Sequence, residues 1–338
     1  FKKHWPDFVT THQNLPLHII NTVEKMLACR DPEKLGYHAY QCPDHPWHCI
    51  FIPNTCKCSC CNSCGKKLTD KFIAKVETNF PKTPFPHSCF TIPDSLRELC
   101  DKNRFLLNGL FKAATQTILS WGKEKHFLPL VIAAGHSFGR RLNFNSHIHL
   151  LITAGGLALR NNQPTNRGKR CTYIPFVMLH KRYRFLLITI LKQTITKYLQ
   201  QNPNCGELGV FSRPEVLDAF FDPLLELNWY VHDSKELPPE RFTISYIVRY
   251  TKRPPLAESR ILEYRPREDF GPNQFCVTFS IKPHDEPEII KTVCVEDFIS
   301  LLIQHIPPPH FRQVRYYGAL ANRAKKQLLS LVFAALNQ

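Results

Sequence analysis

The chain has 338 residues, a length that suits about two or three domains. Hydrophobic residues make up 43% and charged residues 21%, a composition typical of a globular protein. No run approaches the roughly 20 apolar residues of a membrane-spanning helix, so we expect no membrane partner. Lys and Arg number 44 against 28 Asp and Glu, and the net charge of +16 favours a polyanionic partner, most simply a nucleic acid.

A helical segment and a cysteine-rich segment are predicted first. Residues 1–28 carry apolar side chains at helical spacing. Eight of the 14 cysteines lie in residues 29–64, which lack regular hydrophobic periodicity. Such clustered thiols in a chain of this length indicate zinc rather than a disulfide framework. The candidate zinc ligands are Cys29, His38, Cys42, His45, Cys56, Cys61 and Cys64.

Two pairs in this segment have the spacing of zinc knuckles. They are Cys42-x2-His45 and Cys61-x2-Cys64, and two such pairs typically complete one tetrahedral zinc ion. The remaining candidates would then be ligands of a second ion. Additional cysteines at 49, 58 and 60 leave the ligand set open. The zinc is expected to be structural.

The rest of the chain alternates strands and helices. We predict strands at 87–93, 127–138 and 147–153, and helices at 66–78, 95–121, 176–200 and 214–227. Residues 157–170 are polar and basic and predict a mobile loop. Further predictions are a helix at 240–251, strands at 260–265, 274–281 and 289–295, and a helix at 295–306.

A His-Ile-His triplet in the third of these strands suggests a metal site. His147 and His149 alternate along the strand, so they point to the same face, where two imidazoles can hold a divalent cation. His136 on the preceding strand is the first choice for a third ligand, with Asn145 and His232 as substitutes. A pair of core histidines is the alternative reading.

Two tyrosines in the helix at 240–251 are candidate nucleophiles. Tyr246 and Tyr250 are four residues apart and therefore share a helix face. Arg249, Lys252 and Arg253 surround them with positive charge, which would hold a phosphodiester and favour a phenolate. A phenol that faces a metal-polarised phosphate can cut and rejoin DNA through a phosphotyrosine link. Paired tyrosines that only pack are the alternative.

Three sequence blocks carry a resemblance to a known family. The blocks are GHSFGRRLNFNSHIHLLITAGGL, SYIVRYTKRPPLAESRI and HIPPPHFRQVRYYGALANR. They resemble signature blocks of the two-tyrosine rolling-circle transposases, the insertion-sequence family numbered ninety-one. Cys56-x4-Cys61-x2-Cys64 resembles a run in the zinc-binding domain of that family. The chain departs from the family pattern at His45, where a second Cys is expected, and in its extra Cys58 and Cys60.

The resemblance implies a His-hydrophobic-His (HUH) single-strand endonuclease and ligase. Its fold would be α+β, with a central antiparallel sheet flanked by helices and a small N-terminal zinc-binding domain. We expect a helical segment at 1–28, a zinc-binding domain at 29–80, the nuclease domain at 81–265, and strands with a basic helical segment at 266–338. By the resemblance, His147 and His149 bind Mg²⁺ or Mn²⁺, and Tyr246 and Tyr250 are the nucleophiles.

The same resemblance implies the partners. They are single-stranded DNA and hairpin DNA at transposon ends, in a cytoplasmic, nucleoid-associated bacterial protein. The implied DNA-facing residues are Arg249, Lys252, Arg253, Arg315 and Arg323. Trp47, Tyr316 and Tyr317 are candidates for stacking on bases. The alternatives are a replication initiator or relaxase with the same chemistry, and a non-catalytic zinc DNA-binding regulator.

Overall fold

The computed structural model describes residues 1–139, 141–171, 175–203, 205–227, 229, 231–233, 254–267, 274–281 and 287–338. These residues form two compact units, each built from segments that are distant in the sequence. The first comprises Phe1–Ala74, Phe138–Phe144 and Lys252–Phe311, and the second comprises Lys75–Ser137, Asn145–Thr251 and Arg312–Gln338. The four domain ranges expected from the sequence remain a prediction.

The first unit packs helices against a three-stranded sheet. Its helices are α1 (Trp5–Thr11), α2 (Leu17–Leu27), α3 (Pro32–Leu35) and α10 (Val295–Ile303), and a 3-10 turn spans Glu258–Arg260. The antiparallel sheet has the order β10-β9-β8, with β8 at Ile261–Pro266, β9 at Phe275–Ile281 and β10 at Ile289–Cys294. Val23, Phe279 and Ile299 are fully buried in its core.

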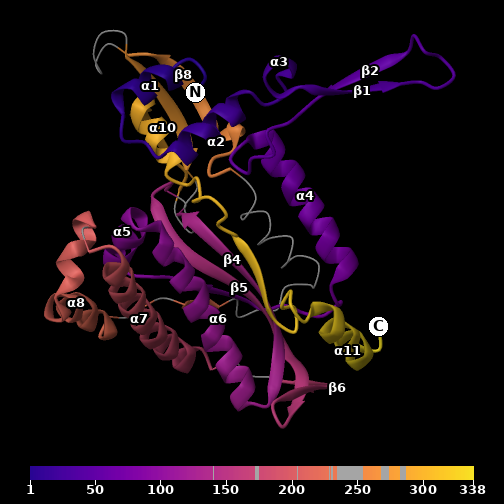
Figure 1. Cartoon of the computed structure of the whole chain (residues 1–338), viewed down its shortest axis with the longest axis vertical. Coiled ribbons are helices and arrows are strands. Elements are labelled where there is room, and N and C mark those ends of the chain that lie inside the picture. Colours follow the sequence, from indigo (N-terminus) through magenta and orange to yellow (C-terminus); the bar gives the residue numbers. More distant parts are fainter. Residues whose placement is uncertain are drawn as a thin grey trace. The chain divides into compact units, whose positions relative to one another are not determined.

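A two-stranded hairpin and a long helix complete the N-terminal part. The hairpin joins β1 (Tyr37–Gln41) and β2 (Cys49–Pro53), and both strands are exposed almost throughout. Helix α4 follows at Asn62–Asn79 (Figure 1). A hairpin with both faces exposed buries no core of its own, so its base must be held by other contacts.

The second unit contains the main sheet, whose strand order is β11-β4-β5-β3-β7, with β6 paired to β5. Its strands are β3 (His87–Phe90), β4 (Phe127–Phe138), β5 (Phe144–Arg160), β6 (Gln163–Arg170), β7 (Val231–Asp233) and β11 (Val314–Gly318). Its helices are α5 (Asp94–Lys102), α6 (Leu107–Glu124), α7 (Phe176–Gln201), α8 (Pro214–Phe221) and α11 (Lys325–Leu336), with 3-10 turns at Arg104–Leu106, Gly206–Ser212 and Asp222–Leu225. Helices α5 to α8 lie on one side of the long strands β4 and β5 (Figure 1). The α+β class with antiparallel sheets and flanking helices is confirmed.

Two differences from the predicted elements have local causes. The prediction of a mobile loop at 157–170 is wrong, because β5 continues to Arg160 and β6 pairs with it in the antiparallel direction. Asn161 and Asn162 turn the chain with φ of 52° and 61°, which asparagine tolerates well and tight hairpin turns require. The predicted helix at 95–121 is divided at Asn103, whose non-helical backbone (φ −126°, ψ 71°) ends α5 before α6 begins.

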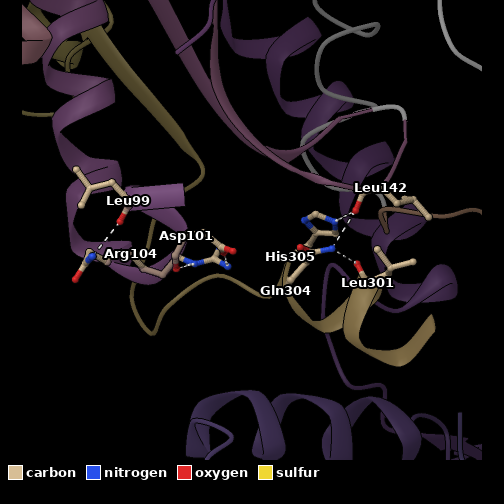
Figure 2. A network of polar contacts seen from close by, with 8 residues as sticks. Leu99, Asp101, Arg104, Leu142, Leu301, Gln304 and His305 are labelled. Atoms are coloured by element: carbon tan, nitrogen blue, oxygen red, sulfur yellow. Dashed lines mark hydrogen bonds and ion pairs between the residues drawn. The ribbon is translucent and has the colours of Figure 1, made fainter. Parts of the chain in front are cut away.

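Polar contacts hold two of the turns (Figure 2). In the second unit, the side chain of Asn103 donates to the Leu99 carbonyl (3.1 Å). Arg104, which follows α5, forms an ion pair with Asp101 in the last turn of this helix. In the first unit, Gln304 Nε2 donates to the carbonyls of Leu142 and Leu301, each at 3.0 Å. Leu99 and Leu301 lie in the last turns of α5 and α10, and Leu142 lies in the turn between β4 and β5, so these bonds fix two helix ends and one turn.

Gly135 on β4 allows α6 to pack closely against the sheet. A Cβ at this position would lie 2.6 Å from Cζ of Phe111, a fully buried residue of α6. We expect Gly135→Ala to lower the free energy of unfolding by about 1–3 kcal/mol, because the buried ring must shift. Chemical denaturation measures the effect. Gly209→Ala is the control, since a Cβ there meets no atom of the described residues within 4 Å, and equal denaturation midpoints for the two variants would contradict the expectation.

Candidate functional site

Three histidines of the main sheet, His136, His147 and His149, lie close together on the face opposite α6. Because Gly135 faces Phe111 of α6, the next residue of β4, His136, points to the other face. There its ring centroid lies 4.3 Å from that of His149 and 5.2 Å from that of His147, and these two lie 4.8 Å apart. The structure therefore brings together the three imidazoles that the sequence predicted.

Strand β3 adds two residues that sequence reasoning missed. Cys89 is the register partner of His149, and His87 Nε2 lies 2.7 Å from His149 Nδ1. One ligand atom from each of Cys89, His147 and His149 fits within a span of 4.8 Å. The HSCFTIP strand showed His and Cys at alternate positions, but only the pairing of β3 with β5 shows that they reach the His-Ile-His pair.

Burial keeps His136, His147 and His149 neutral. It lowers the pKa of His147 to about 4, although the hydrogen bond to the Asn145 carbonyl opposes the shift. Burial also lowers the pKa of His136 and His149 well below the usual value, and neighbouring imidazoles add to the effect. A neutral imidazole has a lone pair for a cation, whereas a protonated one does not.

The site is chemically suited to a divalent cation. His147 Nδ1 lies 2.7 Å from the Asn145 carbonyl oxygen, which can only accept, so Nδ1 carries the proton and Nε2 remains available as a ligand. Donor atoms bound to one ion at about 2.0–2.3 Å must lie less than about 4.6 Å apart, and the ligand atoms of Cys89, His147 and His149 lie within 4.8 Å of one another. His147 and His149 are therefore suitable ligands, with His136 and Cys89 beside them.

The two substitutes for a third ligand are placed differently. The Oδ1 atom of Asn145 is buried and has no hydrogen-bond partner among the described residues, so it is also a candidate for contact with the ion. His232 lies in β7, where its backbone is the register partner of Cys89. The candidate nucleophiles Tyr246 and Tyr250 and the cations Arg249, Lys252 and Arg253 lie outside the described residues.

In the first unit, four cysteines form a second candidate metal site. Cys29, Cys56, Cys61 and Cys64 place their sulfur atoms within 4.8 Å of one another. The Cys29–Cys64, Cys56–Cys64 and Cys29–Cys61 distances are 3.7, 3.5 and 3.9 Å. Ligands of a tetrahedral Zn²⁺ with Zn–S bonds of about 2.3 Å lie about 3.8 Å apart, so the cluster matches zinc.

Hydrogen bonds favour the thiolate of Cys64, whereas burial raises the pKa of Cys56 and Cys61. Backbone N–H groups of Cys56 and Cys58 donate to the sulfur atoms of Cys29 and Cys56, each at 3.5 Å. Burial opposes ionisation of Cys64, but hydrogen bonds from Thr55 and Cys56 outweigh it and lower the pKa of this thiol to about 7. Thiolates are the form of cysteine that binds zinc.

The predicted pairing of knuckles differs from the one in the structure. Cys61-x2-Cys64 joins Cys29 and Cys56 instead of the Cys42-x2-His45 pair. Arg30 N–H donates to the Asn54 carbonyl (3.1 Å), which closes the base of the hairpin and brings residue 29 beside residue 56.

The other candidates in the hairpin lie apart from this group. Cys42 and His45 are at the turn of the hairpin, where Cys42 Sγ lies 3.7 Å from His45 Nδ1. His38 is exposed in β1.

The remaining predicted DNA contacts vary in exposure. Trp47 in the hairpin turn is 81% exposed, and Arg323 is also exposed. Arg315 instead lies over the Phe111 ring at 4.0 Å and donates to Asn108 Oδ1 at 2.6 Å. Tyr316 is half-buried and stacks on Phe80, and Tyr317 is also half-buried. None of the helices in the described part of the chain has the length and apolar character needed to cross a membrane.

Comparisons with known proteins agree with this arrangement. Residues 131–327 match the family model described as "Putative transposase", and residues 1–92 match the model described as "Transposase zinc-binding domain". The four-cysteine cluster lies within the second match and the His-Ile-His pair within the first.

Two curated proteins are similar over most of the chain. The transposase for insertion sequence element IS801 of Pseudomonas savastanoi pv. phaseolicola is 34% identical over 94% of this chain and 74% of its own length. The "Putative transposase y4qJ" of Sinorhizobium fredii is 24% identical over 98% of this chain and 81% of its own length. No solved structure gives a significant match. The chain belongs to the IS91-type transposase family, whose zinc-binding domain it carries at the N-terminus.

Proposed function

We propose that the chain cuts and rejoins single-stranded DNA at transposon ends through a 5′-phosphotyrosine intermediate. The observation that carries this proposal is the group of neutral imidazoles, His136, His147 and His149, on one face of the main sheet. Family membership supports DNA cleavage and strand transfer as the activity. The net charge of +16 suits a polyanionic substrate.

The chemistry requires a nucleophile, a leaving group and charge stabilisation. The hydroxyl of Tyr246 or Tyr250 loses its proton, and its oxygen attacks the scissile phosphorus. The bond from phosphorus to the 3′ oxygen breaks, the 3′ oxygen takes up a proton, and the 5′ phosphate stays on the tyrosine. A Mg²⁺ or Mn²⁺ ion held by His147 and His149 would polarise the phosphate.

The reverse reaction joins strands. A free 3′ hydroxyl attacks the phosphotyrosine and restores both a phosphodiester and the phenol, so no nucleotide cofactor is consumed. Arg249, Lys252 and Arg253 would hold the phosphodiester by charge-assisted hydrogen bonds. The second tyrosine would allow a target strand to be cut while the first link persists, which gives a reason for two tyrosines four residues apart in the sequence.

Two other functions compete with this proposal. A replication initiator or relaxase would use the same chemistry at a replication origin, and the zinc-binding domain at residues 1–92 favours the transposase. A non-catalytic DNA-binding regulator would need no divalent cation. The imidazole group favours the transposase over the regulator, because histidines that can hold a divalent cation serve metal-dependent cleavage of DNA.

A gel assay separates these functions. The full chain is incubated with Mn²⁺ and labelled single strands that cover both flanks of its gene, and the products are run on a denaturing gel. We expect label to move with the protein band and to be lost with EDTA. Bound DNA without any covalent adduct, in Mg²⁺ as well as Mn²⁺, would support the regulator. A strand from a plasmid origin serves as the control for the initiator.

A further inference from the structure

Cys89 is a chemically unusual neighbour for the histidine pair. It lies on β3 opposite His149 of β5, and directly opposed residues of antiparallel strands project to the same face of the sheet. Its side chain is buried, with 8% exposure, on the face that carries His147 and His149. The thiol is therefore shielded from solvent within the group of imidazoles.

The three side chains are grouped closely, as the ligands of one ion would be. A ligand atom from each of Cys89, His147 and His149 lies within 4.8 Å of the other two. His87 Nε2 lies 2.7 Å from His149 Nδ1, and a hydrogen bond there leaves His149 Nε2 to face an ion. His147 is oriented in the same way by the Asn145 carbonyl.

The donor set determines which ions bind well. Mg²⁺ prefers oxygen ligands, whereas a thiolate with two imidazoles suits Zn²⁺ and Co²⁺. We propose that Cys89 is a ligand of the cation held by His147 and His149, and that this sulfur gives the centre a preference for Zn²⁺ and Co²⁺ over Mg²⁺. Coordination replaces the thiol proton with the cation, and the proton is released to solvent.

A sulfur ligand at this centre would also affect DNA cleavage, an effect that rests on the proposed function. A soft ion that occupies the centre tightly would displace Mg²⁺ and change the rate of cleavage. We expect Zn²⁺ to inhibit Mg²⁺-supported cleavage by the native chain. In Cys89→Ser, which lacks the sulfur ligand, the Zn²⁺ concentration for half-inhibition of cleavage should be about tenfold higher or more than in the native chain.

Cobalt spectroscopy tests the ligand directly and needs no DNA. The full-length chain is stripped of metal, reloaded with Co²⁺ and compared with Cys89→Ser and Cys100→Ser. Cys100 is the matched control, because it is a fully buried free cysteine of α5 outside the histidine group. The four-cysteine cluster contributes equally to all three spectra, so their differences isolate one sulfur.

We expect Cys89→Ser to lose the near-ultraviolet thiolate-to-cobalt absorption of one Co–S bond, while Cys100→Ser matches the native spectrum. Identical spectra for the native chain and Cys89→Ser would overturn the proposal. Cys89→Ala provides a second variant, and circular dichroism verifies that each variant is folded. A cobalt difference without any DNA cleavage would refute the proposed function and leave this inference standing, and normal cleavage with identical spectra would do the reverse.

Discussion

The chain with both Tyr246→Phe and Tyr250→Phe is expected to form no covalent adduct with single-stranded DNA. Phenylalanine keeps the ring and removes only the hydroxyl oxygen that attacks phosphorus, so binding should persist. Loss of a nucleophile usually lowers the rate by about 10³-fold or more. Label that stays with the protein on a denaturing gel measures the adduct, and a mobility-shift assay measures binding.

The single variants distinguish the roles of the two hydroxyls. Each should retain adduct formation by the remaining tyrosine and lose one of the two cleavages, so that full transposition stops in both. Tyr198→Phe is the control, since this α7 tyrosine stacks on Phe105, 4.5 Å between centroids, away from the histidine group. Full transposition by the double variant would end the proposal of a phosphotyrosine intermediate.

Patterns of burial made the main sheet predictable. The run at 127–138 is apolar almost throughout because β4 is buried on both faces, and its bounds match the prediction. The hairpin of β5 and β6 was missed because β6 is polar and mostly exposed, and the signal lay in the Asn161–Asn162 turn. Alternation along β5 was enough to place His147 and His149 on one face.

Contacts between distant segments could not be predicted in the same way. Cys89 and His87 contact the histidine group because of the register in which β3 pairs with β5. The sequence of either strand alone does not determine that register. The zinc ligands show the same limit. Spacing identified the Cys61-x2-Cys64 knuckle, but the partners depend on how the chain closes the base of the hairpin.

The four-cysteine cluster should be indispensable for folding of the N-terminal segment. The hairpin it adjoins is exposed on both faces, and a metal can supply stability there that a hydrophobic core does not. Zinc contributes on the order of 10 kcal/mol to the folding of zinc-finger peptides. We therefore expect Cys61→Ser to lose one bound zinc ion per chain and to make residues 29–64 sensitive to proteases.

Cys60→Ser is a matched control, because Cys60 is adjacent to Cys61 in sequence and lies outside the four-sulfur group. Metal content by mass spectrometry and the pattern of limited proteolysis should be unchanged in this variant. A chelator added to the native chain should reproduce the proteolysis pattern of Cys61→Ser, and excess zinc should reverse it. If Cys42→Ser instead of Cys61→Ser removed the zinc, the ion would lie at the hairpin turn, and the knuckle pairing seen here would not be the metal-binding one.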